Sequence, residues 1–179
     1  PVAPATITRN ASGNATIRAV RLEAPLDMDG ALDETVYTTV VPVDGFIQQL
    51  PDEGAPPTEQ TAAWVFFDAQ NISISPRLWD AAPEAEQGAN EMQRDSFQLM
   101  NNENFSVSLD TFYDRRNGYA FQVNPLGGFF DFQLTDEGNP NSDWNPIWNV
   151  RTGRFDGGWS VEMQIPFKSL RYRPGNAQV

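Results

Sequence analysis

Apolar and polar residues alternate along much of the chain, most clearly between residues 105 and 124. Residues 105–113 carry apolar side chains at most odd positions and Ser or Asp at the even positions up to Asp110, and residues 119–124 repeat the alternation. Successive side chains of a strand point to opposite faces of a sheet. The Asn117-Gly118 pair between the runs supplies residues that tolerate a positive φ. The segment therefore predicts a β-hairpin with one core face and one polar face.

Similar short runs, separated by Gly, Pro, Asn and Asp, occur over the whole sequence. Strands are expected near residues 15–22, 45–49, 61–68, 72–79, 105–113, 119–124, 129–135, 147–154 and 159–166. Short helical turns are expected within residues 32–40, 83–96 and 166–170. Many short antiparallel strands with alternating faces are typical of sandwiches. The predicted fold is therefore all-β: an antiparallel β-sandwich of immunoglobulin-like or jelly-roll type, with one or two short helical turns.

Composition removes several kinds of chemistry. The 179 residues include neither cysteine nor histidine, which excludes disulfides, thiolate nucleophiles, Ser-His-Asp catalysis and ordinary zinc sites within this chain. The formal net charge of −12 lacks the cationic footprint that nucleic acids require, so no nucleic-acid partner is expected. The same acidity is compatible with hard cations such as calcium.

Four segments, taken in order, resemble a known family. They are "MDGALDETVY", "WVFFDAQNISISPRLWD", "SVSLDTFYDRRNGYAFQVNPLGGFFDFQLTDEG" and "DWNPIWNVRTGRFDGGWSVEMQIPFKSLRY", and they lie between Leu26 and Arg173. They are similar to the family 9 carbohydrate-binding-module-like domain, in the branch that precedes a predicted outer-membrane β-barrel in Gram-negative bacteria. The resemblance implies an immunoglobulin-like β-sandwich, in agreement with the strand pattern.

The resemblance also implies a function. It indicates a non-catalytic carbohydrate-binding module of an exported cell-envelope protein, in the periplasm or outer membrane of a Gram-negative bacterium. An oligo- or polysaccharide would be its ligand, and a C-terminal outer-membrane β-barrel of the same protein its partner. The alternative is a structural or protein-interaction domain in front of such a barrel, without sugar affinity. No enzyme is expected in this domain, and the activity of a full-length protein stays open.

Residues 1–179 are interpreted as one domain. Members of the family continue with further strands after the position of Val179, so we expect the natural protein to continue and the domain to be truncated at its C-terminal end.

Two turns of the sequence are rich in acidic residues. Asp27, Asp29 and Asp33 surround Gly30, and residues 134–143 hold further carboxylates. Oxygen-rich turns of this kind can hold calcium, so calcium is the one cofactor that the pattern allows, although its ligands are unknown. The family resemblance implies instead a structural role, in which Gly30 makes a tight turn and Asp33 caps the following helix.

Polar residues occupy the positions opposite the apolar ones in several predicted strands: Asp110, Gln122, Asn124, Asp131, Gln133, Glu162 and Gln164. Sugar hydroxyls both donate and accept hydrogen bonds, and carboxylates and amides suit them. The alternative is that the sheet simply has one solvated side. Two of these carboxylates could in principle pair for glycoside hydrolysis, but no cleft is visible in the sequence.

Five tryptophans are many for this length. Trp64 and Trp159 lie in core positions of predicted strands, whereas Trp144 and Trp148 lie in the turn-rich "NSDWNPIWN" and are the better platforms for stacking on a pyranose. Packing within the loop is the alternative for both. The predicted ligand-binding residues are Asp110, Gln122, Asn124, Trp144 and Trp148, with no catalytic residue.

The resemblance can be carried over position by position. Sugar-binding members hold the sugar between two tryptophans, with a glutamate and an arginine among the hydrogen-bonding groups. The glutamate falls on Ser106, the arginine on Gln122, the first tryptophan near Asn101 or Asn102, and the second beyond Val179. Asp110 and Asn124 fall on positions that the family usually keeps. Asp110 also has a structural alternative, because it lies close enough to Arg115 and Arg116 to pin the hairpin loop.

Overall fold

The computed structural model describes residues 7–11, 15–82, 88–136 and 140–173, which belong to two compact units. Unit 1 consists of Pro1–Ala82 and Asn149–Gln164, and unit 2 of Pro83–Trp148 and Ile165–Val179. Within the described ranges, no helix has the length and apolar character that crossing a membrane requires. The interpretation of residues 1–179 as one truncated domain stays a prediction.

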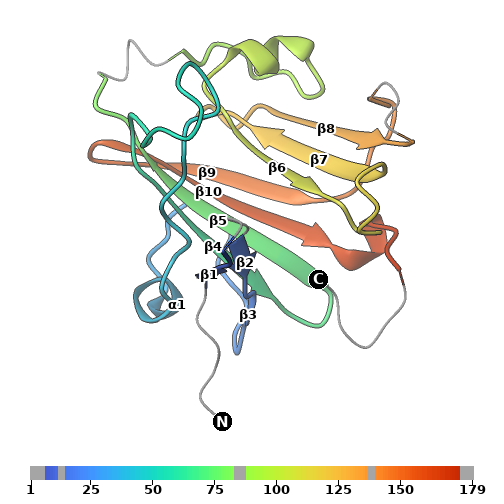
Figure 1. The fold of residues 1–179 in the computed structure, drawn as a ribbon, viewed down its shortest axis with the longest axis horizontal. Helices are drawn as coiled ribbons and strands as arrows, with labels where there is room; N and C mark the ends of the chain where they lie inside the picture. Colours follow the sequence, from blue (N-terminus) through green and yellow to red (C-terminus); the bar gives the residue numbers. More distant parts are fainter. Residues whose placement is uncertain (1–6, 12–14, 83–87, 137–139, 174–179) are drawn as a thin grey trace. The chain divides into compact units, whose positions relative to one another are not determined.

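Unit 1 contains a five-stranded sheet in the order β3-β4-β5-β10-β9 (Figure 1). Its strands are β3 (Val20–Arg21), β4 (Thr61–Phe67), β5 (Asn71–Trp79), β9 (Asn149–Phe155) and β10 (Gly158–Pro166). β4 pairs antiparallel with β5 and β9 with β10, whereas β3 joins β4 in parallel. A separate hairpin is formed by β1 (Ile7–Arg9) and β2 (Ala15–Ile17).

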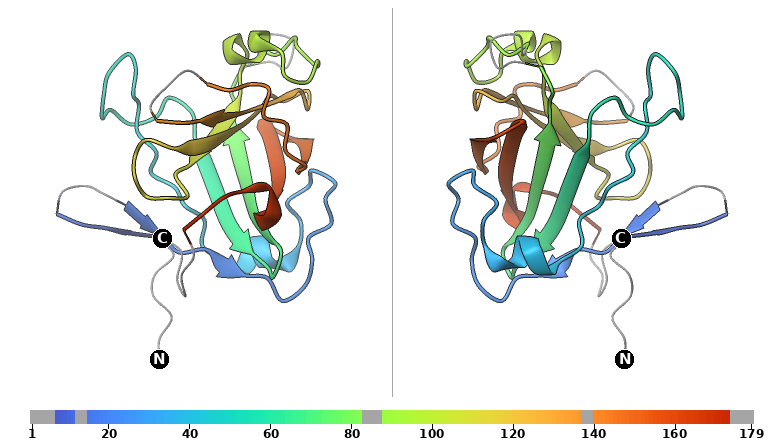
Figure 2. Two further views of the ribbon diagram at one scale, coloured as in Figure 1. Left: turned by 90° about the vertical axis from the view of Figure 1, so that its right-hand side faces the viewer. Right: turned by 90° about the vertical axis from the view of Figure 1, so that its left-hand side faces the viewer.

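One face of β4 carries the apolar core of unit 1. Ala62, Trp64 and Phe66 alternate on this face and pack with Leu26, Leu32 and Tyr37. Tyr37 comes from the short helix α1 (Thr35–Thr39), which Figure 2 shows in light blue beside β4 and β5. Its ring meets those of Trp64 and Phe66 edge-on at centroid distances of 5.4 and 5.5 Å. The predicted core position of Trp64 is thus confirmed, and its indole N–H donates to the Val40 carbonyl at 2.8 Å.

Unit 2 contains a three-stranded antiparallel sheet in the order β6-β7-β8. Its strands are β6 (Phe105–Leu109), β7 (Gly118–Val123) and β8 (Phe129–Leu134), and two single 3₁₀ turns accompany it, η2 (Phe97–Asn101) and η3 (Phe167–Ser169). The central strand β7 is buried on both faces from Tyr119 to Val123. The alternative of a solvated polar face therefore holds for Ser106 and Ser108 of β6, which are exposed, but not for β7.

Residues 88–102 explain this burial, because they cover the face of the sheet on which Gln122 and Phe130 lie. Leu99 of η2 is fully buried, its carbonyl accepts from Nε2 of Gln122 at 3.4 Å, and Phe97 packs on Phe130 at a centroid distance of 5.3 Å. This layer is distant in sequence from the strands that it covers. The alternation within the strands therefore carried no sign of it.

The predicted fold class is confirmed: the described chain is mostly β, with antiparallel sheets and short helical turns. Helical turns stand within residues 32–40 and 166–170 as expected, whereas residues 88–96 hold none, and residues 83–87 lie outside the described residues. The expected strand at 45–49 is absent, because the backbone of Gln48 bonds to Ala55 and Gly54 within its own loop. The predicted segment 15–22 divides into β2 and β3, and β1 was not predicted.

Candidate functional site

The hairpin loop between β6 and β7 is organised by Asp110. Strand β6 ends at Leu109, before the predicted end at residue 113, and the Asp110 carboxylate accepts the backbone N–H groups of Phe112, Asp114 and Arg115 at 3.2, 3.2 and 2.7 Å. Asp110 therefore holds the loop in place, as its structural alternative predicted. It does so through backbone amides and not through the guanidinium groups of Arg115 and Arg116. Asp110 thus has a structural role, and its predicted ligand-binding role stays a prediction.

Positive φ values occur at Tyr113 (54°) and Arg115 (58°), not at the Asn117-Gly118 pair. The expectation about that pair was therefore wrong, because the Asp110 bonds move the tight turn to an earlier position in the loop. Tyr113 is 75% exposed in this conformation.

Asp114 fixes the second half of the loop. Its carboxylate accepts the backbone N–H groups of Arg116 and Asn117, both at 2.8 Å, and the Asn117 amide at 2.7 Å. The side-chain bond from Asn117, followed by the two backbone bonds, holds the pKa of Asp114 below its usual value. Asn117 in turn accepts from the Asp136 backbone N–H at 3.1 Å, and Arg116 forms an ion pair with Asp136. The loop is thereby tied to the end of β8.

Asn124 is fully buried and all of its hydrogen-bonding groups are used. Its Nδ2 donates to the Glu91 carbonyl at 2.5 Å and to Oδ1 of Asn102 at 3.1 Å. Its Oδ1 accepts the backbone N–H groups of Leu126 and Gly128 at 3.1 and 2.9 Å. The side chain joins residues 88–102 to the β7–β8 turn, which a ligand would have to displace to reach it.

The two tryptophans of the predicted site lie on the other face of the sheet. Trp148 is only 7% exposed and packs edge-on against Phe121 and Phe129 at centroid distances of 5.0 and 5.1 Å. Trp144 is half-buried and lies 4.7 Å from Tyr119, centroid to centroid. Of the two, Trp144 is the one that keeps accessible ring surface.

Strand register separates the five predicted residues. Phe121 pairs with Asp131 and Gln122 with Phe130, and paired residues point to the same side of a sheet. Asp131 therefore shares a face with Phe121 and the tryptophans, while Gln122 lies on the opposite face. The structure brings Trp144 and Trp148 together, and places Gln122 and Asn124 elsewhere.

Asp131 is a buried carboxylate that Trp148 and Arg94 both contact. Nε1 of Trp148 donates to its Oδ2 at 2.9 Å, and the Arg94 guanidinium lies 3.3 Å from the same oxygen. Oδ1 has no hydrogen-bond partner among the described residues. Burial raises the pKa of Asp131, and the bond from Trp148 and the charge of Arg94 oppose the shift.

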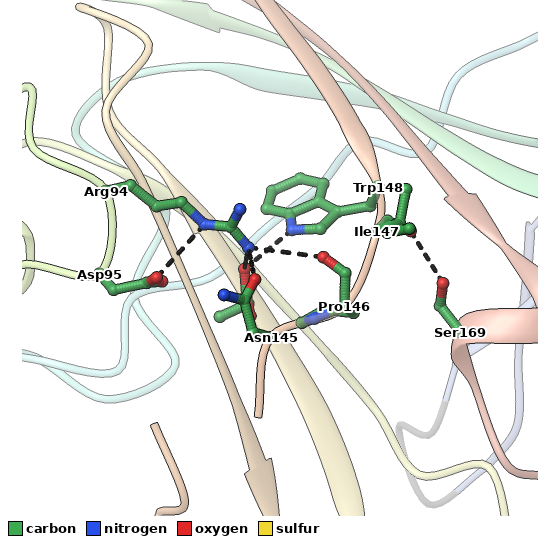
Figure 3. Close-up of polar contacts among 8 residues, drawn as sticks. Arg94, Asp95, Asn145, Pro146, Ile147, Trp148 and Ser169 are labelled. Atoms are coloured by element: carbon green, nitrogen blue, oxygen red, sulfur yellow. Dashed lines mark hydrogen bonds and ion pairs between the residues drawn. The ribbon is translucent and has the colours of Figure 1, made fainter. Parts of the chain in front are cut away.

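Arg94 is the residue of this cluster that the sequence did not single out. Its guanidinium also contacts Asp95, Asn145 and the Pro146 carbonyl (Figure 3). It lies 4.9 Å from the Phe129 ring centroid as well. The sequence predicts only short helical turns within residues 83–96. Nothing in that pattern indicates that Arg94 pairs with the buried Asp131.

A shallow pocket of about 280 Å³ opens beside the hairpin loop. It is lined by Phe112, Asp114, Asn117, Gly118, Tyr119, Gln133, Leu134, Thr135 and Arg171. Tyr119, whose ring packs on Trp144, forms a buried wall, and its hydroxyl accepts the backbone N–H of Arg171 at 3.2 Å. Among the described residues, the side chains of Gln133 and Arg171 have no hydrogen-bond partner, so both can bind a ligand.

Glu162, on β10 of unit 1, does not lie on a solvated face as expected, because it is fully buried. Its Oε2 accepts the backbone N–H groups of Asp29 and Gly30 at 3.0 and 2.9 Å, and its Oε1 accepts from the Tyr37 hydroxyl at 3.1 Å. Burial raises the pKa of Glu162, and the Gly30 bond is the main opposing effect. This carboxylate holds the acidic turn in place.

The turn itself contains Gly30 at φ 91°, as expected of a tight turn. The expected cap by Asp33 is wrong: α1 begins at Thr35, its N-cap is Glu34, and no side chain caps it. Within the described ranges, no three acidic side chains come together as a metal site.

No family profile and no characterised protein sequence matches the chain. Its fold is similar to a carbohydrate binding module family 9 from Caldicellulosiruptor kristjanssonii in complex with cellotriose (TM-score 0.54, 16% identity, 83% of this chain and 66% of that chain). The module in complex with glucose matches similarly (TM-score 0.55, 17% identity, 89% and 71%). A protein from Bacteroides uniformis, provisionally assigned as carbohydrate-binding, matches with a TM-score of 0.61 and 11% identity over 84% and 72%.

The chain thus spans just under two thirds of the first of these structures. At such low identity the likeness shows the fold alone. The chain has the β-sandwich fold of the family 9 carbohydrate binding modules.

Proposed function

We propose that the chain is a non-catalytic carbohydrate-binding module. The observation that carries the proposal is its fold, which it shares with family 9 modules solved with cellotriose and with glucose. A fold by itself hosts many functions, so the site has to supply the chemistry.

The pocket beside the hairpin loop is the place that fits this function. Gln133 offers an amide donor and acceptor, Arg171 offers donors, and the rings of Tyr119 and Phe112 supply apolar surface, the combination that pyranose hydroxyls and C–H faces require. Trp144 supports this wall by packing on Tyr119. Among the five predicted residues, Trp144 and Asp110 therefore act here by shaping the pocket, through Tyr119 and through the loop.

The pocket is open and its polar groups are hydrated when it is empty. Hydrogen bonds to a sugar then replace bonds to water with little net gain. The expected dissociation constant is weak, on the order of 10 μM to 1 mM.

The test is a glycan array with the isolated domain, followed by calorimetric titration of the best saccharide. Binding should fall by about two- to tenfold in Gln133→Ala, which removes one unpaired polar group from the pocket. Gln164→Ala, a glutamine in unit 1, is the matched control and should bind like the parent. Absence of binding to every saccharide would refute the proposal.

A protein-interaction domain without sugar affinity is the second candidate. The observation that favours it is the loop after α1, where Val41, Ile47 and Leu50 are 67%, 68% and 83% exposed. Exposed apolar side chains that gather in one loop are typical of protein contacts. Loss of all glycan binding together with capture of a partner that requires Ile47 and Leu50 would favour this function.

The sequence resemblance supports one further part of the proposal. It is that the protein is exported to the periplasm or outer membrane of a Gram-negative bacterium, with a barrel of the same protein as partner. Cell fractionation with an antibody against the domain tests this, and a cytoplasmic location would refute it.

A further inference from the structure

Basic residues gather around the pocket in an otherwise acidic chain. The chain has 12 basic and 24 acidic residues, yet Arg115 and Arg116 lie in the hairpin loop that forms one wall, and Arg171 and Arg173 follow η3. The segment with Arg171 and Arg173 is held against the loop, because the Arg173 N–H donates to the Thr111 carbonyl at 3.4 Å and Thr111 Oγ1 donates to the Arg171 carbonyl. The backbone of residues 171–173 is therefore fixed beside the hairpin loop that carries Arg115 and Arg116.

The carboxylates nearby are already engaged. Asp110 accepts three backbone N–H groups, and Asp114 accepts two backbone N–H groups and one amide. Asp136 forms an ion pair with Arg116. Each of these three carboxylates thus has hydrogen-bond or ion-pair partners of its own within unit 2.

Arg171 is the cation that lines the pocket itself. Its backbone is anchored through Tyr119 and Thr111, whereas its exposed guanidinium has no partner among the described residues. A guanidinium presents a planar fork of donors that matches a carboxylate with two parallel hydrogen bonds. Gln133 lines the same pocket and can bind hydroxyl groups. Phe112 lines the pocket as well and offers an aromatic ring.

We propose that this pocket binds saccharides that carry a carboxylate, with Arg171 pairing to the carboxylate of a uronic acid. The inference rests on the proposed carbohydrate-binding function and names its ligand class. Gln133 binds the ring hydroxyls, and Phe112 packs on the C–H face of the sugar. Arg115, exposed in the adjacent hairpin loop, adds positive charge.

The test compares ligands that differ only in charge. Trigalacturonate and its methyl ester are titrated into the parent protein by calorimetry at 20 mM and 300 mM NaCl. The acid should bind at least about tenfold more tightly than the ester at low salt, and the difference should shrink at high salt because screening weakens a partly exposed ion pair. Acetate and phosphate serve as simple anions and should not compete at the concentration of the oligosaccharide.

Two variants locate the effect. Arg171→Gln should lose at least about tenfold in affinity for the acid and leave that for the ester unchanged. Arg21→Gln, an exposed arginine on β3 of unit 1, is the matched control and should bind both ligands like the parent. Melting temperatures of both variants should match that of the parent, since neither guanidinium forms a hydrogen bond or ion pair among the described residues.

The possible outcomes distinguish a failure of the uronic-acid assignment from a failure of the carbohydrate-binding function. Equal affinity for acid and ester, or an Arg171→Gln variant that keeps full affinity for the acid, overturns the uronate assignment while carbohydrate binding stands. Competition by acetate or phosphate at equal concentration overturns it too, because the pocket is then only an anion site. Failure to bind either trisaccharide or any neutral glycan overturns both proposals.

Discussion

The indole N–H of Trp148 donates to Oδ2 of Asp131 at 2.9 Å, beneath the half-exposed guanidinium of Arg94. Both side chains are buried, and the second oxygen of Asp131 has no partner among the described residues. A buried carboxylate depends on its few donors, because an unpaired charge is costly away from water. Trp148 is thus a structural residue of unit 2 rather than an exposed platform for a sugar.

The first prediction tests this bond. Trp148→Phe keeps most of the aromatic packing but removes the N–H donor, and should lower the free energy of unfolding by about 1–3 kcal/mol. Urea denaturation followed by circular dichroism measures the change. Trp144→Phe is the control, since its indole N–H donates no hydrogen bond among the described residues, and a loss as large as that of Trp148→Phe would contradict the role given to Asp131.

The second prediction concerns Gly30. Its φ is 91°, and an added Cβ would lie 2.5 Å from the Thr152 carbonyl carbon and 2.8 Å from the Gly153 nitrogen. Gly30→Ala should therefore lower the free energy of unfolding by more than about 3 kcal/mol, because the unfavourable backbone conformation and the clash act together. Gly157→Ala separates the two causes, because its φ of 85° is similar but nothing lies within 4 Å of its Cβ.

The free energy of unfolding of the control variant, Gly157→Ala, should fall by only about 1 kcal/mol. Thermal denaturation of both variants measures the difference. Similar losses in the two variants would show that the close approach of the Gly30 turn to β9 does not contribute to stability.

The third prediction is a pH dependence from Glu162. Burial raises its pKa in the folded state above the ordinary value of 4.5, so the folded protein holds this proton more tightly than the unfolded chain. The resulting contribution to stability is complete below pH 4.5 and is lost as the pH rises through the folded-state pKa. Around the carboxylate, the charge of Glu34 raises this pKa as well, whereas the bonds from Gly30, Tyr37 and Asp29 lower it.

Glu162→Gln removes the titration and keeps an oxygen for the Asp29 and Gly30 N–H groups. The difference in unfolding free energy, parent minus variant, should decrease as the pH rises from 4.5 to 8. Urea denaturation at a series of pH values gives this difference directly, and other carboxylates cancel because both proteins carry them. A difference that is constant with pH, or that grows, would contradict the assignment.

The fourth prediction concerns the hairpin loop. Asp110→Ala leaves three backbone N–H groups without their acceptor and should lower the free energy of unfolding by about 1–3 kcal/mol. In a chain of this size that corresponds to a fall in melting temperature of roughly 2–4 °C per kcal/mol. The carboxylate of the exposed Asp52 accepts no hydrogen bond from any residue that the structure describes, and Asp52→Ala should melt within a degree or so of the parent.

Alternation of side chains determined where most strands lie, because a period of two is a local property that each segment carries by itself. The runs that became β4, β5, β7, β8, β9 and β10 could be located this way, and Trp64 and Trp159 could be placed in the core. The end of β6 before Asp110 could not be predicted from the alternation, because it depends on three hydrogen bonds that compete with continuation of the strand.

Tertiary structure alone decided which polar residues are accessible. Alternation gives the two faces of a strand but not what covers them. Gln122 and Asn124 are buried by residues 88–102, and Glu162 by a turn more than a hundred residues earlier in the sequence. Register between β7 and β8 then placed Asp131 on the face opposite Gln122, and brought it to Arg94, 37 residues away. Such long-range contacts form only when segments distant in sequence pack together, so the pattern within one strand cannot specify them.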